Sequence, residues 1–164
     1  MKKLLFPALL ALLLALPLPA SALCLLCWCS VSSTPIAFGA YNPMSSLPHD
    51  SDGSVDFTCG GLVGALVTYQ VSLGKGANSS TFNPRRLYNA ATSYVDYNLY
   101  TTSGRSVVWG DGSEGSQTVA GNVSILLLGG TTAHIVTYGR IPGSQTSVKP
   151  GSYLDSVLIT VTYN

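Results

Sequence analysis

The sequence predicts an all-β fold, built as one antiparallel sandwich or barrel. Short runs of apolar and β-branched residues recur along the chain, and each is closed by a cluster of Gly, Pro, Asn, Asp or Ser. This alternation is typical of strands and turns in such folds. Helical periodicity is weak after residue 22, and no internal repeat divides the chain. A length of 164 residues suits a single ordinary core.

The first 22 residues predict a secretory signal peptide. Two lysines precede an apolar run that ends in Ala-Ser-Ala at residues 20–22, the layout of an export signal with its cleavage site. Two prolines interrupt the run before it reaches the roughly 20 residues of a membrane-spanning helix. Cleavage after Ala22 leaves residues 23–164 as one exported domain. A lipoprotein site at Cys24 is a minor alternative, because Leu23 before it is large for that cleavage.

The exported chain is close to neutral. The whole sequence has 8 basic and 7 acidic residues, and two of the basic ones, Lys2 and Lys3, lie in the leader. This balance gives no electrostatic basis for nucleic acid or an anionic membrane as a partner. Charged residues make up only 9% of the chain, so we expect a surface rich in hydroxyl and amide groups.

Several short strands are expected along the exported chain. The first is broken at Pro35, and a polar, Pro-rich loop follows it; residues 81–93 could hold one short helical turn. About seven short antiparallel strands result, in a chain of immunoglobulin-sandwich size. The expected runs are 30–41, 55–61, 66–73, 92–102, 106–112, 122–130, 133–141 and 156–164.

Two of these strands show which face should be buried. In the second run, Val55, Phe57 and Cys59 fall on one face by the period-two rule. In the third run, Val67, Tyr69, Val71 and Leu73 alternate with polar residues. We expect both sets to point into the core.

The C-terminal run has the same character. Four residues share one continuous apolar face, whereas Leu158, Thr160, Thr162 and Asn164 share the other. A chain end usually frays into polar residues, so this end reads as a core strand that stops at the terminus. The apolar face consists of Val157, Ile159, Val161 and Tyr163.

The histidines do not predict an enzyme. His49 lies in a Pro- and Asp-bearing loop and His134 in a predicted strand, and neither adjoins a nucleophile motif. No G-x-S-x-G, H-E-x-x-H or phosphate-binding glycine loop occurs. We therefore expect no catalytic residues, no cofactor and no small-molecule substrate.

Two acidic stretches invite a calcium interpretation. Asp50, Asp52 and Asp56 alternate, and alternating carboxylates can face one hard cation. The closing Glu of an EF-hand loop is missing, and Asp with Gly is the usual composition of a turn. We therefore favour a turn at Asp50, Asp52 and Asp56. For Asp111 and Glu114, the second stretch, we expect a tight turn beside a packed aromatic.

The four cysteines should reach an oxidising compartment, where disulfides persist. Three lie in "CLLCWC" at 24–29, and the fourth is Cys59. A zinc site would need a second ligand pair, which only Cys59 with His49 or His134 could supply. A structural disulfide is favoured over a metal.

Several separated motifs resemble one known family, the spore coat protein U domain. That family includes secreted pilus subunits of the archaic chaperone–usher type, and the resemblance spans the exported chain in the right order. The motifs are "CSVSSTPIAFGAYNP" from Cys29, "GSVDFTC" ending at Cys59, "YNLYTT" from Tyr97, "VVWGDG" ending at Gly112 and "YGRIPGSQTSVKPGSYLDSVLITVTY" from Tyr138.

The resemblance implies an incomplete immunoglobulin-like sandwich that lacks its final strand. A periplasmic chaperone would first lend a strand to the open groove, and the N-terminal extension of a sister subunit would replace it at an outer-membrane usher. Such donor-strand complementation is β-augmentation, in which main-chain hydrogen bonds fill an empty sheet edge. An open edge is also an aggregation hazard, which explains the need for a chaperone.

The resemblance also assigns roles to residues of this chain. Cys29 and Cys59 carry the family's cysteine pair, whereas Cys24 and Cys27 are not part of that pattern. These two could pair with each other, bond another chain, or displace Cys29 from its partner. The groove edge gripped by a chaperone would be the terminal strand, with its penultimate aromatic, namely Gly151, Val157, Ile159, Val161 and Tyr163.

One feature departs from the family pattern. Only residues 23–28 precede Cys29 after the expected cleavage, whereas a donor strand needs about ten residues. Either cleavage falls earlier, or this subunit accepts a strand without donating a full one. The second option would suit a tip position, or a coat protein that does not polymerise by this route.

Two functions follow, from different classes. The leading hypothesis is a non-enzymatic structural subunit of a surface pilus or coat, exported through the periplasm and acting by self-assembly with sister subunits. The alternative is an adhesive binding module, a tip-type subunit that recognises glycan or a surface through its loops.

Overall fold

The computed structural model describes residues 27–62, 64–90, 92–125 and 129–164, and this part of the chain contains strands and no helix. The all-β prediction is therefore confirmed. The signal peptide and most of the predicted donor segment lie outside the described residues. The strands are β1 (Trp28–Thr34), β2 (His49–Gly61), β3 (Ala65–Leu73), β4 (Arg85–Asn89), β5 (Ser93–Tyr100), β6 (Val119–Ile125), β7 (Gly129–Ile141) and β8 (Ile159–Tyr163).

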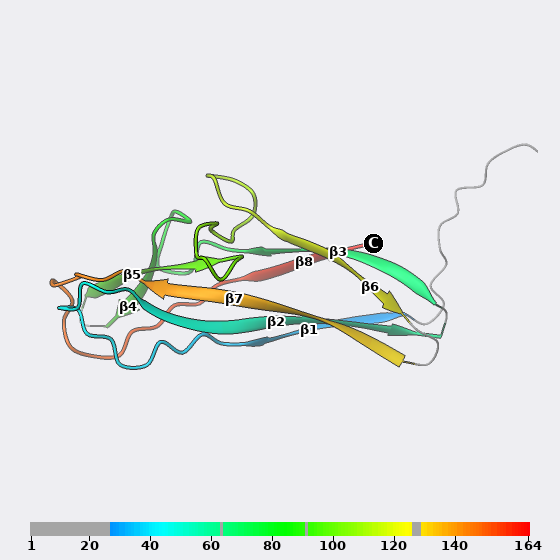
Figure 1. Ribbon diagram of the computed structural model, residues 1–164, viewed down its shortest axis with the longest axis horizontal. Coiled ribbons are helices and arrows are strands. Elements are labelled where there is room, and N and C mark those ends of the chain that lie inside the picture. Colours follow the sequence, from blue (N-terminus) through cyan, green and yellow to red (C-terminus); the bar gives the residue numbers. More distant parts are fainter. Residues whose placement is uncertain (1–26, 63, 91, 126–128) are drawn as a thin grey trace, which may run out of the picture.

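The strands form two antiparallel sheets that pack face to face (Figure 1). The larger sheet has the order β1-β2-β7-β5-β4, and the smaller one has the order β6-β3-β8. β2 and β7 pair along their whole length, from His49 opposite Ile141 to Gly61 opposite Gly129. Long pairing of this kind fixes the register, because a slip by one residue would turn every buried side chain outward.

The core consists of two clusters of buried side chains between the sheets. One includes Trp109 and extends over β2, β3, β5 and β7, and the other includes Phe57 and lies toward the Cys29 end. Tyr69 and Val161 pack against both clusters and so connect them. The predicted inward residues of the second and third runs all belong to these clusters or pack against them, which confirms their phase.

Three local predictions are wrong. Asp50 and Asp52 do not form a turn, because they belong to the long strand β2. Residues 81–93 hold no helical turn; instead Arg85–Asn89 pairs with β5 as β4. Residues 106–112 form no regular strand and make only isolated bridges, at Val108 and Trp109. Asp50 and Asp52 pair with the distant strand β7, and Arg85–Asn89 pairs with the next strand, β5, so in both cases pairing overrides the local preference. Residues 106–112 have no such continuous partner.

The turn at "WGDGSEG" forms beside a packed aromatic, as predicted. Trp109 is fully buried, and its indole nitrogen donates to the carbonyl oxygen of Val71 at 3.1 Å. Gly112 and Gly115 have φ angles of 94° and 77°, which glycine adopts without a steric penalty. The Ser113 amide donates to the carboxylate of Asp111 at 2.8 Å, which closes the turn.

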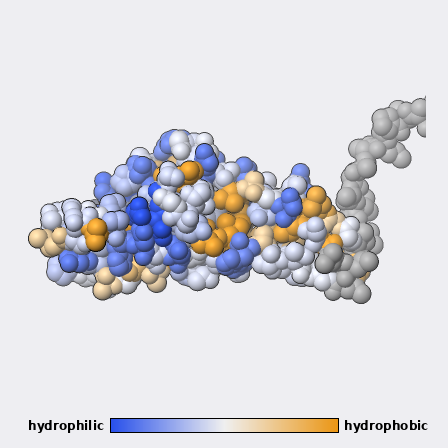
Figure 2. All heavy atoms as spheres, in the orientation of Figure 1, coloured by the Kyte–Doolittle hydropathy of each residue, from blue (hydrophilic) through white to orange (hydrophobic). Residues whose placement is uncertain are grey.

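Figure 2 shows the face of the molecule over β6 and β7. Hydrophilic surface gathers over the C-terminal end of β7, and apolar surface lies farther along this face. Arg140, near that end of β7, contacts Asp50 through two hydrogen bonds of 2.7 and 2.8 Å. No helix in the described residues is long and apolar enough to cross a membrane.

Candidate strand-accepting groove

A groove separates β1 from β8, the strands at the edges of the two sheets. Among the described strands, β1 pairs only with β2 and β8 only with β3. A cavity of about 240 Å³ lies between them, lined on one side by residues 33–36 and Phe38 and on the other by Val157 and Ile159. We call this the β1–β8 groove. Its floor includes the buried side chains of Val55, Leu73 and Leu99.

The backbone of β8 is open toward the groove. Thr68 and Asn164 exchange hydrogen bonds, with N···O distances of 3.3 and 3.2 Å, and Gly74 donates to Leu158 at 2.8 Å. Antiparallel strands alternate between hydrogen-bonded and non-hydrogen-bonded pairs. The even-numbered residues of β8 therefore bond to β3, and the N–H and C=O groups of Ile159, Val161 and Tyr163 point to the open side.

The apolar side chains of the C-terminal run also face the groove. Successive side chains of a strand point to opposite faces, and Val157, Ile159 and Val161 all pack against the core while remaining partly exposed. Tyr163 is 53% exposed, and its ring centroid lies 5.5 Å from that of Phe57. β8 thus offers apolar side chains and unpaired backbone groups to one gap.

The backbone of β1 is open toward the same gap. The Cα atoms of Cys29 and Cys59 are 4.1 Å apart, a separation typical of a non-hydrogen-bonded antiparallel pair. By alternation, the backbone groups of Cys29, Val31 and Ser33 point away from β2. Val31 lies opposite the fully buried Phe57 and shares its inward face, yet it is 46% exposed. Its exposure shows that the inner face of β1 lacks a cover.

β1 and β8 run in opposite directions along the groove. Val31 lies opposite Phe57, which contacts Tyr163 at the end of β8, whereas Ser33 and Thr34 line the cavity with Ile159 and Val157. A strand inserted between them would therefore be parallel to one and antiparallel to the other. Both arrangements allow main-chain hydrogen bonding.

A polar group closes the floor of the groove. Asp155 lines the cavity and accepts a hydrogen bond of 2.6 Å from the hydroxyl of Tyr97. It also accepts bonds of 2.9 Å from the Ala77 amide and from the Asn78 side chain. Burial, with the bond to Asp155, raises the pKa of Tyr97 far above its usual value, so the phenol stays neutral. The polar groups of the groove floor are thus hydrogen-bonded to other residues of this chain.

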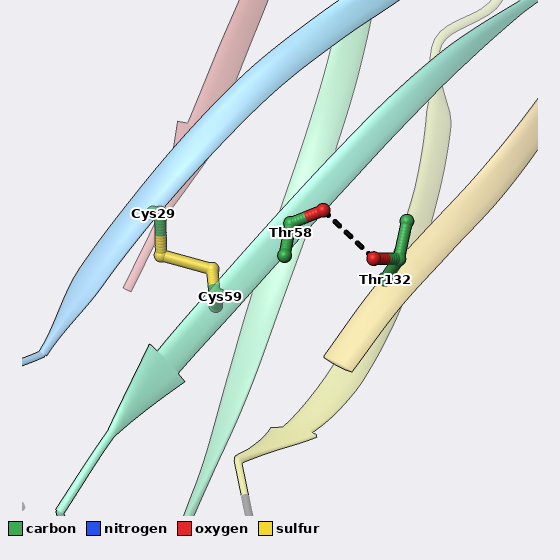
Figure 3. The surroundings of a disulfide bond; sticks show 4 residues. All are labelled: Cys29, Thr58, Cys59 and Thr132. Carbon is green, nitrogen blue, oxygen red and sulfur yellow. Dashed lines mark hydrogen bonds between the residues drawn. A yellow bond between two sulfur atoms is a disulfide. The ribbon is translucent and has the colours of Figure 1, made fainter. Parts of the chain in front are cut away.

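The disulfide joins the groove strand β1 to the sheet behind it. Cys29 and Cys59 are direct cross-strand partners, and their sulfurs are bonded (Figure 3). On the neighbouring pair of strands, the hydroxyls of Thr58 and Thr132 bond at 2.8 Å. Cys27 is also disulfide-bonded, and Cys24 lies outside the described residues. β1 is therefore tied covalently to β2 although its other side is open.

Gly151 does not border the groove, contrary to the sequence expectation. It lies in the loop before β8, and Leu154, between them, bridges to Tyr88 of β4. Its φ is 144°, and a Cβ placed there would lie 2.2 Å from the amide nitrogen of Asn89. Glycine is needed at this position because of backbone conformation and close approach, not because it opens the terminal strand.

The acidic residues that suggested calcium are bound to basic side chains. Asp50 and Asp52 contact Arg105 at 3.4 and 2.7 Å, and Asp50 also bonds Arg140. The hydrogen bond from Arg140 lowers the pKa of Asp50. Asp56 contacts His134 at 2.5 Å. The described residues contain no cluster of three or more metal-ligating side chains.

Sequence reasoning missed a buried arginine beside the core. Arg85 is fully buried and donates to the Gly74 carbonyl at 2.8 and 3.0 Å, to Asn98 at 2.7 Å and to the Trp109 carbonyl at 2.6 Å. Burial lowers its pKa. In the sequence it adjoins Arg86, which is exposed, so residue type alone does not distinguish them. The period-two alternation of a strand would have distinguished the two arginines.

Comparisons with known proteins identify the family of this chain. The model of the spore coat protein U domain matches residues 18–160. Protein U of Myxococcus xanthus is 34% identical over 134 residues, which cover 77% of this chain and 70% of that protein.

The fold also resembles a solved structure. One chain of the CsuC–CsuE chaperone–tip adhesion subunit pre-assembly complex, from the archaic chaperone–usher Csu pili of Acinetobacter baumannii, superposes with a TM-score of 0.53 at 19% identity. The match covers 83% of this chain but only 39% of that one. This likeness supports an immunoglobulin-like antiparallel sandwich. Because the family model spans most of its length, this chain belongs to the spore coat protein U domain family.

Proposed function

We propose that this chain is an exported structural subunit of a surface pilus or coat, without enzymatic activity, that accepts a β-strand from another polypeptide in the β1–β8 groove. A periplasmic chaperone is the first donor, and the N-terminal extension of a sister subunit replaces it at an outer-membrane usher. Membership of the spore coat protein U domain family supports the role of pilus or coat subunit.

One observation carries the proposal of strand acceptance. Val31 and Val161 belong to edge strands of different sheets, both point inward, and both remain partly exposed. Next to each, backbone donors and acceptors are unpaired on the groove side. An inserted strand would cover the side chains and bond the backbones at the same time, which is the chemistry of β-augmentation.

Hydrogen exchange tests the proposal residue by residue. The exported chain is mixed with a synthetic peptide that copies the N-terminal extension of a sister subunit encoded beside it. We expect new protection at the amides of Ile159, Val161 and Val31, which face the groove. The amides of Thr160 and Thr162 already bond β3 and serve as internal controls.

Two results would contradict the proposal. One is a chain that refolds without chaperone into a stable monomer and binds no sister-subunit peptide. The other is peptide binding that protects the even-numbered amides of β8 and leaves the odd-numbered ones unchanged, because the peptide would then lie elsewhere.

Mass spectrometry of the exported chain would also locate its N-terminus and so define the length of its own donor segment.

A further inference from the structure

A second cavity lies on the opposite edge of the larger sheet, away from the β1–β8 groove. It has a volume of about 580 Å³ and is lined by the loop 77–81, Pro84, Arg86 and Tyr94. Small-molecule sites are commonly of this size. β4 is the edge strand farthest from β1 in its sheet, so a strand in the groove would not cover this cavity.

The floor of this cavity is an aromatic and guanidinium surface on the outer face of β4 and β5. Arg85 and Leu87 point into the molecule, so Arg86 between them points outward, beside Tyr94. The Cζ atom of Arg86 lies 5.7 Å from the ring centroid of Tyr94. The Tyr88 ring lies 5.2 Å from the same ring. Tyr94 is nevertheless 47% exposed, which leaves aromatic surface for a ligand.

The rim of the cavity offers hydrogen-bond acceptors in fixed positions. The Thr81 hydroxyl donates to the Pro84 carbonyl at 3.2 Å, which leaves its oxygen able to accept. The Ser79 hydroxyl lies 2.9 Å from the Thr81 carbonyl and 3.0 Å from the Pro84 carbonyl, and its oxygen accepts from the Thr81 amide at 3.2 Å, so one of its two lone pairs remains. Both amide protons of Asn78 are directed to other groups, to Leu154 at 3.2 Å and to Asp155 at 2.9 Å. Its carbonyl oxygen therefore remains an acceptor as well.

Donors come from the guanidinium group in the floor. Arg86 uses Nε to bond Asp96 at 3.1 Å, and its side chain is 50% exposed. Within the described residues, no hydrogen bond involves its two terminal nitrogens. A ligand that enters the cavity thus meets oxygen acceptors at the rim, and guanidinium donors and an aromatic ring at the floor.

We propose that this cavity is a saccharide-binding subsite. A sugar ring carries many hydroxyl donors, oxygen acceptors and an apolar C–H face, and these match the rim, the guanidinium and the Tyr94 ring respectively. The near-neutral composition of the chain gives no support to a polyanion such as nucleic acid. The two cavities share no lining residue, and the variants tested below avoid Asn78, which bonds Asp155 of the groove floor, so the two activities can fail independently.

A carbohydrate array tests this assignment. The exported chain is applied to immobilised neutral, amino-sugar and uronic-acid oligosaccharides, and the strongest binder is then titrated in solution. We expect Tyr94→Ala and Arg86→Ala each to weaken binding roughly tenfold. Tyr94→Phe should retain it within about twofold, because the ring remains. Leu66→Ala, a 62% exposed position on the other sheet, is the matched control and should change nothing.

Two outcomes would overturn the proposal: no oligosaccharide bound by the wild-type chain, or binding that survives both Tyr94→Ala and Arg86→Ala. If either variant fails to fold, Thr81→Val removes one rim acceptor with almost no change of shape and should still weaken binding. Protection of the groove amides by a donor peptide, measured on the same variants, reports strand acceptance separately. It should remain at the wild-type level.

Discussion

A single charge on the inner face of β8 should abolish strand acceptance. In Val161→Asp, the new carboxylate would replace an apolar side chain that packs against both core clusters. Val161 remains partly exposed while the groove is open, so the variant can keep its charge in contact with water. A donor strand would remove that water and leave the charge without a partner.

The cost can be estimated from these two changes. Losing the burial of a valine costs about 1.5 kcal/mol, and an unpaired buried charge costs about 3 kcal/mol or more. A total of about 4.5 kcal/mol corresponds to a roughly 2,000-fold loss of donor affinity. The neighbouring Thr162→Asp places the same charge on the exposed outer face, where a surface substitution costs ~0.5 kcal/mol.

The assay is titration of a sister-subunit peptide against both variants, together with detection of the subunit at the cell surface. We expect Val161→Asp to bind no peptide at accessible concentrations and to be absent from the surface, and Thr162→Asp to behave as the wild type. Tyr163→Asp should resemble Val161→Asp, because Tyr163 shares its face. Equal surface display of Val161→Asp and the wild type would refute this account of the terminal strand.

Three further predictions concern stability. Replacing both Cys29 and Cys59 with serine should lower the free energy of unfolding by about 3 to 4 kcal/mol, because the bond closes a 30-residue separation; an unchanged denaturant midpoint would contradict this. Arg85→Met should cost about 3 kcal/mol, since its hydrogen-bond acceptors would stay buried without donors; the same change at the exposed arginine that follows it is the control. The hydrogen bond from Arg140 lowers the pKa of Asp50 from 3.8. The ionised carboxylate therefore stabilises the fold above about pH 4, and this stabilisation is lost as the pH falls. In Asp50→Asn, the free energy of unfolding should depend less on pH below about pH 4; an unchanged dependence would contradict this prediction.

Strand phase was predictable from the sequence because it is a local property. Val55 and Phe57 alternate with polar neighbours, and in the structure both are buried. The same rule placed the side chains of Ile159 and Val161 toward the core. Alternation depends only on the pleat of a strand, so no knowledge of the partner strand is needed.

Element boundaries were less predictable where strand pairing overrides the local preference of the residues. Asp50 and Asp52 have turn-forming residue types, yet β7 opposite them extends β2 through that stretch. Arg85–Asn89 reads locally as a helical turn, yet β5 supplies a partner that makes it a strand. The energy of a strand comes mainly from the strand with which it pairs, and the local residue types do not show that partner.

The sequence by itself determined that the chain is all-β, which faces of its strands are buried and that its last strand turns an apolar face toward the core. The tertiary structure alone decided that the open edges of β1 and β8 face one another, that Arg85 is buried while Arg86 is exposed, and that the loop 77–81 meets Tyr94 in a cavity. The alternation of a strand can be read from adjacent residues. The three tertiary contacts depend instead on how the two sheets pack, and packing brings together residues that are far apart in the sequence.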